Sequence, residues 1–93
     1  MIVVVVHIPP SLRSLAGGRA QVEVAAAPTV RETLAALWAI CPGVRDRVLT
    51  ELGEVRTHVN VFIGAESIRY RGGLDAQISD GDELFIIPAV SGG

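Results

Sequence analysis

The sequence contains no lysine, and all eight of its basic residues are arginine. Because lysine supplies the side-chain amine that isopeptide bonds need, no side chain here can accept a protein modifier in that way. The ten acidic residues bring the formal charge to only −2. This charge gives no electrostatic reason to bind nucleic acid or an anionic membrane, so we expect neither among the partners.

Cysteine is also scarce. With Cys41 as its single cysteine, the chain cannot form an intramolecular disulfide, which is typical of a protein in a reducing compartment. The apolar segment 2–8 has no basic region before it and ends at Pro9-Pro10. It is therefore too short for a signal peptide or a membrane span, and we expect a cytoplasmic protein.

No set of residues with convergent catalytic chemistry is evident. Cys41 lies on the apolar stripe of a predicted helix, so we interpret it as a core residue. His7 and His58 fall in predicted strands with no evident base or orienting partner, and two histidines with one cysteine do not complete a zinc set. The acidic residues at 80–83 lack the spacing of a calcium loop and instead predict a tight turn. We therefore expect no metal site and no enzyme.

The pattern of apolar residues predicts one compact domain. Hydrophobic residues make up 49% of the 93 positions, enough for a single core. The expected elements are a strand at 2–8, a strand at 20–24, a helix from about 29 to 41, a shorter helix at 44–52, a strand at 58–64, an edge segment at 65–70 and a last strand at 83–87.

The helix prediction rests on a cap and on a periodic stripe. Thr29 can cap the first turn, and Glu32 follows it three residues later, which is the spacing of a capping box. Apolar residues then recur at helical spacing at Val30, Leu34, Leu37, Trp38 and Cys41. In the shorter helix that follows, Val48, Leu49 or Leu52 is expected to provide the anchor.

The first and last strands are apolar on both alternations, which is typical of central strands covered on at least part of both faces. With the helix between two hairpins, the order ββαβ(β)β predicts an α+β fold, a ubiquitin-like β-grasp with a mixed four- to five-stranded sheet and one main helix. The helix would cover one face. Phe62 and Phe85 are expected on the open face, where exposed aromatic residues favour a partner surface.

The chain ends in a segment too small to hold structure. We place the domain at 1–87 and a flexible tail at 88–93, where Pro88 is followed by Ala-Val-Ser-Gly-Gly. An extended tail of this length reaches about 20 Å. Gly92 and Gly93 remove side chains near the terminal carboxyl group, so it can enter a narrow channel and be activated by a partner that uses ATP. The alternative interpretation is an incidental flexible end.

These residues resemble the MoaD/ThiS family of ubiquitin-like sulfur carriers. The resemblance covers nearly the whole chain, and its most specific elements are the Asp80-Gly81-Asp82 turn, the apolar last strand and the segment 88–93. Within the family, the segments 8–13 and 59–61 and the Gly72-Gly73-Leu74 turn look most like the cysteine-biosynthesis sulfur carriers of actinobacteria.

The resemblance implies a function and a set of partners. Gly93 would be adenylated by an E1-like enzyme and converted to a thiocarboxylate with sulfur from a donor, and the tail residues Val90, Ser91 and Gly92 would be required for this activation. A cysteine synthase that uses pyridoxal phosphate and O-phosphoserine would receive the sulfur, and a zinc metallopeptidase would free the product. The chain itself would bind no cofactor, since ATP and pyridoxal phosphate belong to its partners.

Several alternatives stay open at this point. The chain could serve as the small subunit of molybdopterin synthase, although Arg13-Ser14 stands where that subunit usually has an Arg-Glu pair. It could be a protein modifier joined through Gly93 to lysines of target proteins. It could also be a plain binding module whose two terminal glycines are incidental.

Overall fold

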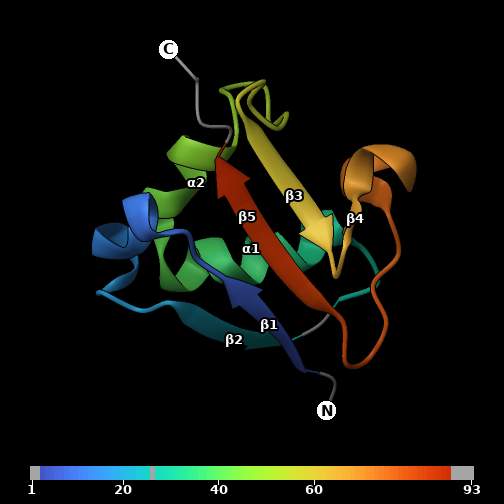
Figure 1. Cartoon of the computed structure of the whole chain (residues 1–93), viewed down its shortest axis with the longest axis horizontal. Helices are drawn as coiled ribbons and strands as arrows, with labels where there is room; N and C mark the ends of the chain where they lie inside the picture. Colours follow the sequence, from blue (N-terminus) through green and yellow to red (C-terminus); the bar gives the residue numbers. More distant parts are fainter. Residues whose placement is uncertain (1–2, 26, 89–93) are drawn as a thin grey trace.

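The computed structural model describes residues 3–25 and 27–88. Five strands form one sheet in the order β2-β1-β5-β3-β4, and two α-helices lie together on one side of it (Figure 1). The strands are β1 (Val3–His7), β2 (Gln21–Ala25), β3 (Val59–Ile63), β4 (Glu66–Ser67) and β5 (Glu83–Pro88), and the helices are α1 (Val30–Ile40) and α2 (Pro42–Val48). Short 3-10 helices occupy Pro10–Ala16, Ile68–Tyr70 and Gly73–Asp75.

The sheet is mixed. β1 pairs with β5 in parallel, whereas the pairs β1–β2, β3–β5 and β3–β4 are antiparallel. The predicted β-grasp fold and its parallel first and last strands are confirmed. Five strands are present, and the prediction of one main helix needs a correction because α2 is a second helix packed against α1 and the first 3-10 helix.

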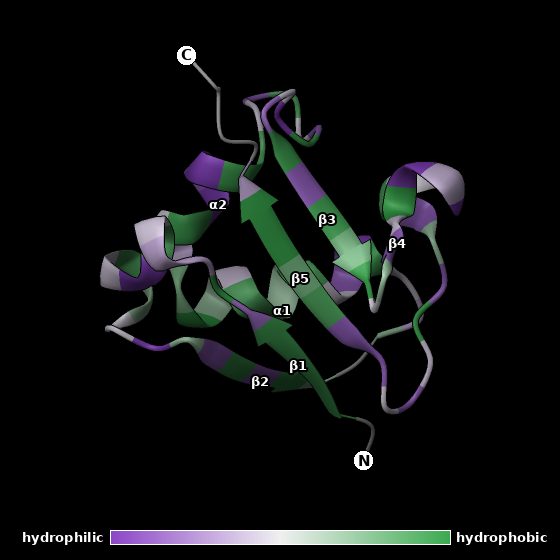
Figure 2. Cartoon of the chain, in the orientation of Figure 1, coloured by the Kyte–Doolittle hydropathy of each residue, from purple (hydrophilic) through white to green (hydrophobic). Residues whose placement is uncertain are grey.

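Alternate residues of the strands build the core. Val4, Val6, Leu84 and Ile86 are at most 2% exposed and point toward the helices. Figure 2 shows hydrophobic residues concentrated along β1, β5 and β3. The other alternation of β1 and β5 is half-buried or exposed, which agrees with the expectation that the second face of these strands is covered only in part.

The predicted helix cap is confirmed. The Thr29 side chain accepts a hydrogen bond from the Glu32 backbone N–H at 3.3 Å, and its hydroxyl donates to the Glu32 carboxylate at 3.1 Å. The stripe at Val30, Leu34 and Leu37 is buried. This cap and stripe fix α1 across the inner face of the sheet.

The second helix begins earlier than predicted. α1 ends at Ile40, and Pro42 starts α2, since proline fits the first position of a helix, where its missing N–H is not needed. α2 ends at Val48. Leu52 is 86% exposed and does not anchor this region, whereas Val48 and Leu49 are buried there.

The turn before β5 forms as predicted. The Asp82 carboxylate accepts a hydrogen bond from the Ser79 backbone N–H at 2.8 Å, and Gly81 has a φ of 85°. Glycine adopts this left-handed conformation at little cost. Across residues 3–25 and 27–88, neither helix has the length and apolar character that crossing a membrane requires.

Candidate functional site

The candidate site lies at the end of β5, at Pro88. This residue pairs with Val59, and the preceding Ile87 pairs with Asn60, so β3 fixes the direction in which the chain leaves the sheet. β5 therefore extends one residue beyond its predicted end. The predicted tail residues Val90, Ser91, Gly92 and Gly93 lie outside the described residues, and their roles stay predictions.

A row of aromatic rings crosses the open face of the sheet. Phe85 stands directly opposite Phe62 across the β3–β5 pair and opposite His7 across the β1–β5 pair. The rings of His7 and Phe85 are stacked with their centroids 4.1 Å apart and their planes 3° apart. All three residues are half-buried, although the helices lie behind the sheet (Figure 1). The row thus forms a half-buried aromatic surface on the open face of the sheet.

The sequence prediction that His7 has no orienting partner is wrong. Its Nε2 lies 2.6 Å from a carboxylate oxygen of Glu83. The two residues are 76 positions apart in the chain and meet only because β1 and β5 are parallel neighbours. His58 lies just before β3 and not within it, with its Nδ1 3.3 Å from the Thr57 hydroxyl.

Two grooves flank the end of β5. The first has a volume of about 450 Å³ and is nearly all apolar, with Pro9, Pro10, Phe85 and Ile87 among its lining residues. It continues the aromatic row toward the tail. The second, of about 460 Å³, lies on the other side and is lined by Ser11, Leu12, Arg47, Arg56, His58, Val59, Ile86 and Pro88. We call this second groove the cationic groove.

The sequence did not group Arg47, Arg56 and His58 into one site, and it indicated no functional partner for His58. They come from α2, from the loop after it and from the residue before β3, and no local motif links them. The only available signal was the antiparallel pairing of the strand near residue 59 with the last strand, which places His58 next to the end of that strand. The positions of the arginines depend on α2, whose bounds the sequence did not give correctly.

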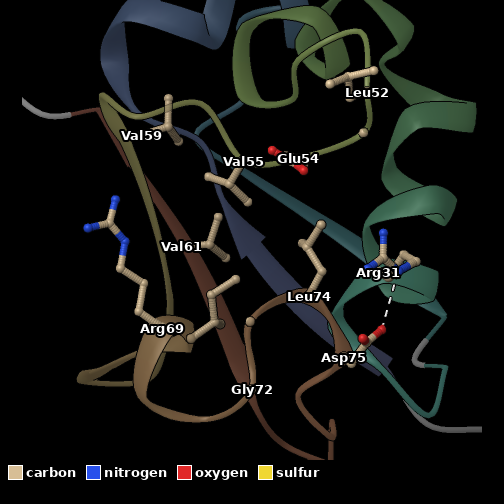
Figure 3. A pocket seen from close by; sticks show the side chains of 13 residues that line it. Arg31, Leu52, Glu54, Val55, Val59, Val61, Arg69, Gly72, Leu74 and Asp75 are labelled. Carbon is tan, nitrogen blue, oxygen red and sulfur yellow. Dashed lines mark hydrogen bonds and ion pairs between the residues drawn. The ribbon is translucent and has the colours of Figure 1, made fainter.

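A further pocket of about 470 Å³ opens on the helix side of β3 (Figure 3). Val55, Val61 and Leu74 form its apolar floor, while both cations and carboxylates stand at its rim. One such pair joins Arg31 Nε to Asp75 Oδ1 at 3.3 Å. The pocket does not include the end of β5, so it has no direct connection to the tail.

Cys41 belongs to the core. It is 1% exposed, and the Arg19 guanidinium donates a 3.7 Å hydrogen bond to its sulfur. This position agrees with its interpretation as a structural residue. Among residues 3–25 and 27–88, no group of at least three His, Cys, Asp or Glu side chains could hold a metal ion.

Comparison with known proteins agrees with this geometry. A profile of the ThiS family matches residues 6–93. The sulfur carrier protein CysO of Mycobacterium tuberculosis is 36% identical over 92 residues, which cover 97% of this chain and 98% of the relative. Small archaeal modifier protein 1 of Haloferax volcanii is 36% identical over 83 residues, covering 88% of this chain and 91% of that protein.

A solved structure matches the whole domain. A chain in the crystal structure of the Amycolatopsis orientalis BexX/CysO complex has a TM-score of 0.89 and 38% identity, with 97% of this chain and 99% of the other covered. The two similar proteins named above are carriers or modifiers by name, not enzymes. Because the family profile matches nearly the whole sequence and the fold agrees, the chain belongs to the ThiS family.

Proposed function

We propose that this protein is a sulfur carrier whose Gly93 carboxyl group is adenylated and then converted to a thiocarboxylate. The observation that carries the proposal is that the family match extends through Gly93, in a chain 36% identical to a protein named as a sulfur carrier. The described part of the chain adds a β5 strand held firmly at the start of the tail.

The proposed chemistry takes place at the terminal carboxyl group. A carboxylate oxygen of Gly93 attacks the α-phosphorus of ATP, the bond to the β-phosphate breaks, and pyrophosphate leaves. A sulfur nucleophile from the donor then attacks the carbonyl carbon, and the bond from this carbon to the AMP oxygen breaks. Both steps occur in the active site of an E1-like partner. The carrier supplies only the reacting group and its presentation.

The fold is suited to presenting the tail to a partner. Ile86, which is 2% exposed, anchors β5 in the core, and β3 pairs with β5 up to Pro88. A rigid strand reduces the conformational freedom that must be lost when the tail enters a partner. The aromatic row beside it offers the same partner a surface to dock on, with Phe62 and Phe85 at its centre.

The similarity to CysO supports cysteine biosynthesis as the process that uses the sulfur. In this proposal a cysteine synthase that holds pyridoxal phosphate removes phosphate from O-phosphoserine, and the thiocarboxylate sulfur bonds to the carbon that carried it, so the product stays joined to Gly93. A zinc metallopeptidase then releases the product from Gly93. The carrier itself binds no cofactor, and ATP is consumed by its activating enzyme.

Intact-protein mass spectrometry tests the central step. We expect incubation with ATP, a cognate E1-like enzyme and a sulfur source to replace one oxygen of the wild-type protein by sulfur. Deletion of Gly93 should abolish this exchange and leave the fold intact, because the residue lies outside the domain. Leu52→Ala, a change at an exposed side chain, is the matched control that should still be converted. Absence of exchange in the wild-type protein with its cognate enzymes would contradict the proposal.

The similarity to small archaeal modifier protein 1 favours a second candidate function, the attachment of Gly93 to lysines of other proteins. In such a role the activated carbonyl carbon is attacked by an amine and not by sulfur. Cell lysates probed for this protein would then contain conjugates of higher mass. These bands should vanish when Gly93 is deleted and persist in the Leu52→Ala control.

A further inference from the structure

The cationic groove differs in charge from the pocket on the helix side of β3. Its lining contains Arg47, Arg56 and His58 and, among the described residues, no carboxylate. The pocket on the helix side of β3 carries the carboxylates of Glu54 and Asp75 beside its arginines. This local excess of positive charge occurs in a chain whose formal charge is −2.

The nearby acidic residue does not neutralise the groove. The side chain of Asp46 is 81% exposed and pairs with Arg45 at 3.4 Å. Its backbone oxygen accepts a 2.8 Å hydrogen bond from Arg56 Nε, which holds the Arg56 guanidinium in place. Arg47 stands in the last turn of α2 and is exposed. Arg56 is thus held at the groove, and Arg47 is accessible there.

The groove lies where a receiving protein must make contact. This step rests on the proposed function, in which the carboxyl group of Gly93 enters a partner's active site. Residues 89–93 follow Pro88, and an extended segment of this length spans only about 17 Å. The rim of the partner's channel must therefore meet the residues around Pro88, and these include the lining of the cationic groove.

The length of segment 89–93 distinguishes two possible sources of the negative charge that meets the groove. Nucleotide phosphates that react with Gly93 lie at the far end of the tail, about 17 Å from the groove when the tail is extended. Carboxylate side chains on the partner's surface can instead surround the channel entrance. The distance favours protein carboxylates as the groups that meet Arg47 and Arg56.

We propose that the cationic groove is a docking site for an acidic segment at the channel entrance of the protein that receives the tail. Arg47 and Arg56 pair with carboxylates of that segment, and the apolar floor formed by Leu12, Val59 and Ile86 packs against its aliphatic carbons. The aromatic row supplies a second contact on the other side of β5. Pairs of exposed charges act mainly on the rate of association and depend strongly on salt.

Charge reversal in the activation assay is the first test. We expect Arg47→Glu/Arg56→Glu to lower kcat/KM for activation by the cognate E1-like enzyme about tenfold or more at low salt, with the difference nearly lost at about 0.5 M salt. The matched control is Arg31→Glu/Arg71→Glu, which changes the net charge equally at exposed sites away from β5. Arg47→Glu alone should show part of the effect without removing the Arg56 hydrogen bond.

Three results separate the two proposals. If the groove variants are activated as well as the wild-type protein and the control at every salt concentration, the docking proposal is overturned. The carrier function then stands. If the groove variants lose activity equally at low and high salt, the charges do not act as proposed. If the wild-type protein is not activated at all, the carrier proposal fails, and the docking site is judged by a measurement that needs no enzyme.

That measurement is an NMR titration with a hexaglutamate peptide. We expect amide shifts confined to residues around the cationic groove, weakened by salt and lost in Arg47→Glu/Arg56→Glu, but retained in Arg31→Glu/Arg71→Glu. Shifts spread evenly over all arginines would overturn the proposal, as would no shifts at all. A hexalysine peptide should cause no shifts at the groove.

Discussion

The two faces of the sheet use the same apolar residue types for different purposes. In β5, Ile86 is 2% exposed and faces the helices, whereas the next residue, Ile87, is 44% exposed on the open face. In β3, Val61 is buried, whereas Phe62 is only half-buried. A sheet face that water covers usually carries polar residues. We therefore expect the apolar and aromatic residues of the open face to contribute less to folding than the core residues, in agreement with the partner surface proposed above.

The sharpest test of this contrast replaces two neighbouring residues of one type. We expect Ile86→Ala to lower the free energy of unfolding by about 2 to 5 kcal/mol, because it leaves a cavity among core side chains. Ile87→Ala should lower it by less than about 1 kcal/mol, because the side chain is already partly in water. Urea denaturation followed by circular dichroism measures both values.

Each of these two variants is the control for the other, since both lose the same atoms from adjacent positions of β5. Equal losses of stability would show that the open face is packed as tightly as the core, and the contrast between the faces would fail. Val61→Ala, a core change in β3 outside both proposed contact surfaces, should be activated by the E1-like enzyme at a normal rate where it stays folded. Ile87→Ala should be activated more slowly despite its greater stability.

The next prediction concerns the aromatic row. Phe85→Ala should lower kcat/KM for activation about tenfold or more, as removal of a central aromatic contact does at many interfaces. Its effect on unfolding should be smaller, about 1 to 2 kcal/mol, from lost burial and from the lost stack on His7. Tyr70→Ala removes an aromatic residue that is 83% exposed and serves as the control. Normal activation of Phe85→Ala would argue against the open face as a docking surface.

Much of the buried face could be predicted because its signals are local. The Thr29 cap, the stripe of α1 and the Asp82 turn each depend on residues a few positions apart, and each formed as expected. The topology followed from the order of these elements. The placement of Phe62 and Phe85 on one face followed from strand alternation, since a strand turns successive side chains to opposite sides.

The site around Pro88 could not be predicted in the same way. The Glu83 partner of His7 depends on the parallel register of β1 and β5, which the sequence does not specify. The cationic groove depends on the bounds of α2, which begins at Pro42 and ends at Val48, whereas the apolar pattern predicted 44–52. Leu52 was a plausible anchor by composition, but α2 ends too early to bring it to the core.

The smallest expected effect on stability concerns the His7–Glu83 pair on the open face. Glu83→Ala removes the carboxylate that lies 2.6 Å from His7 Nε2, yet we expect the free energy of unfolding to change by less than about 1 kcal/mol. The Glu83 side chain is 51% exposed and that of His7 is 23% exposed, and pairs in contact with water contribute little. Urea denaturation of Glu83→Ala beside Ile86→Ala gives the two values under one condition. If Glu83→Ala lowered the free energy of unfolding as much as Ile86→Ala does, the His7–Glu83 pair on the open face would be essential to the fold. The open face could then not be interpreted as a surface that serves mainly to bind partners.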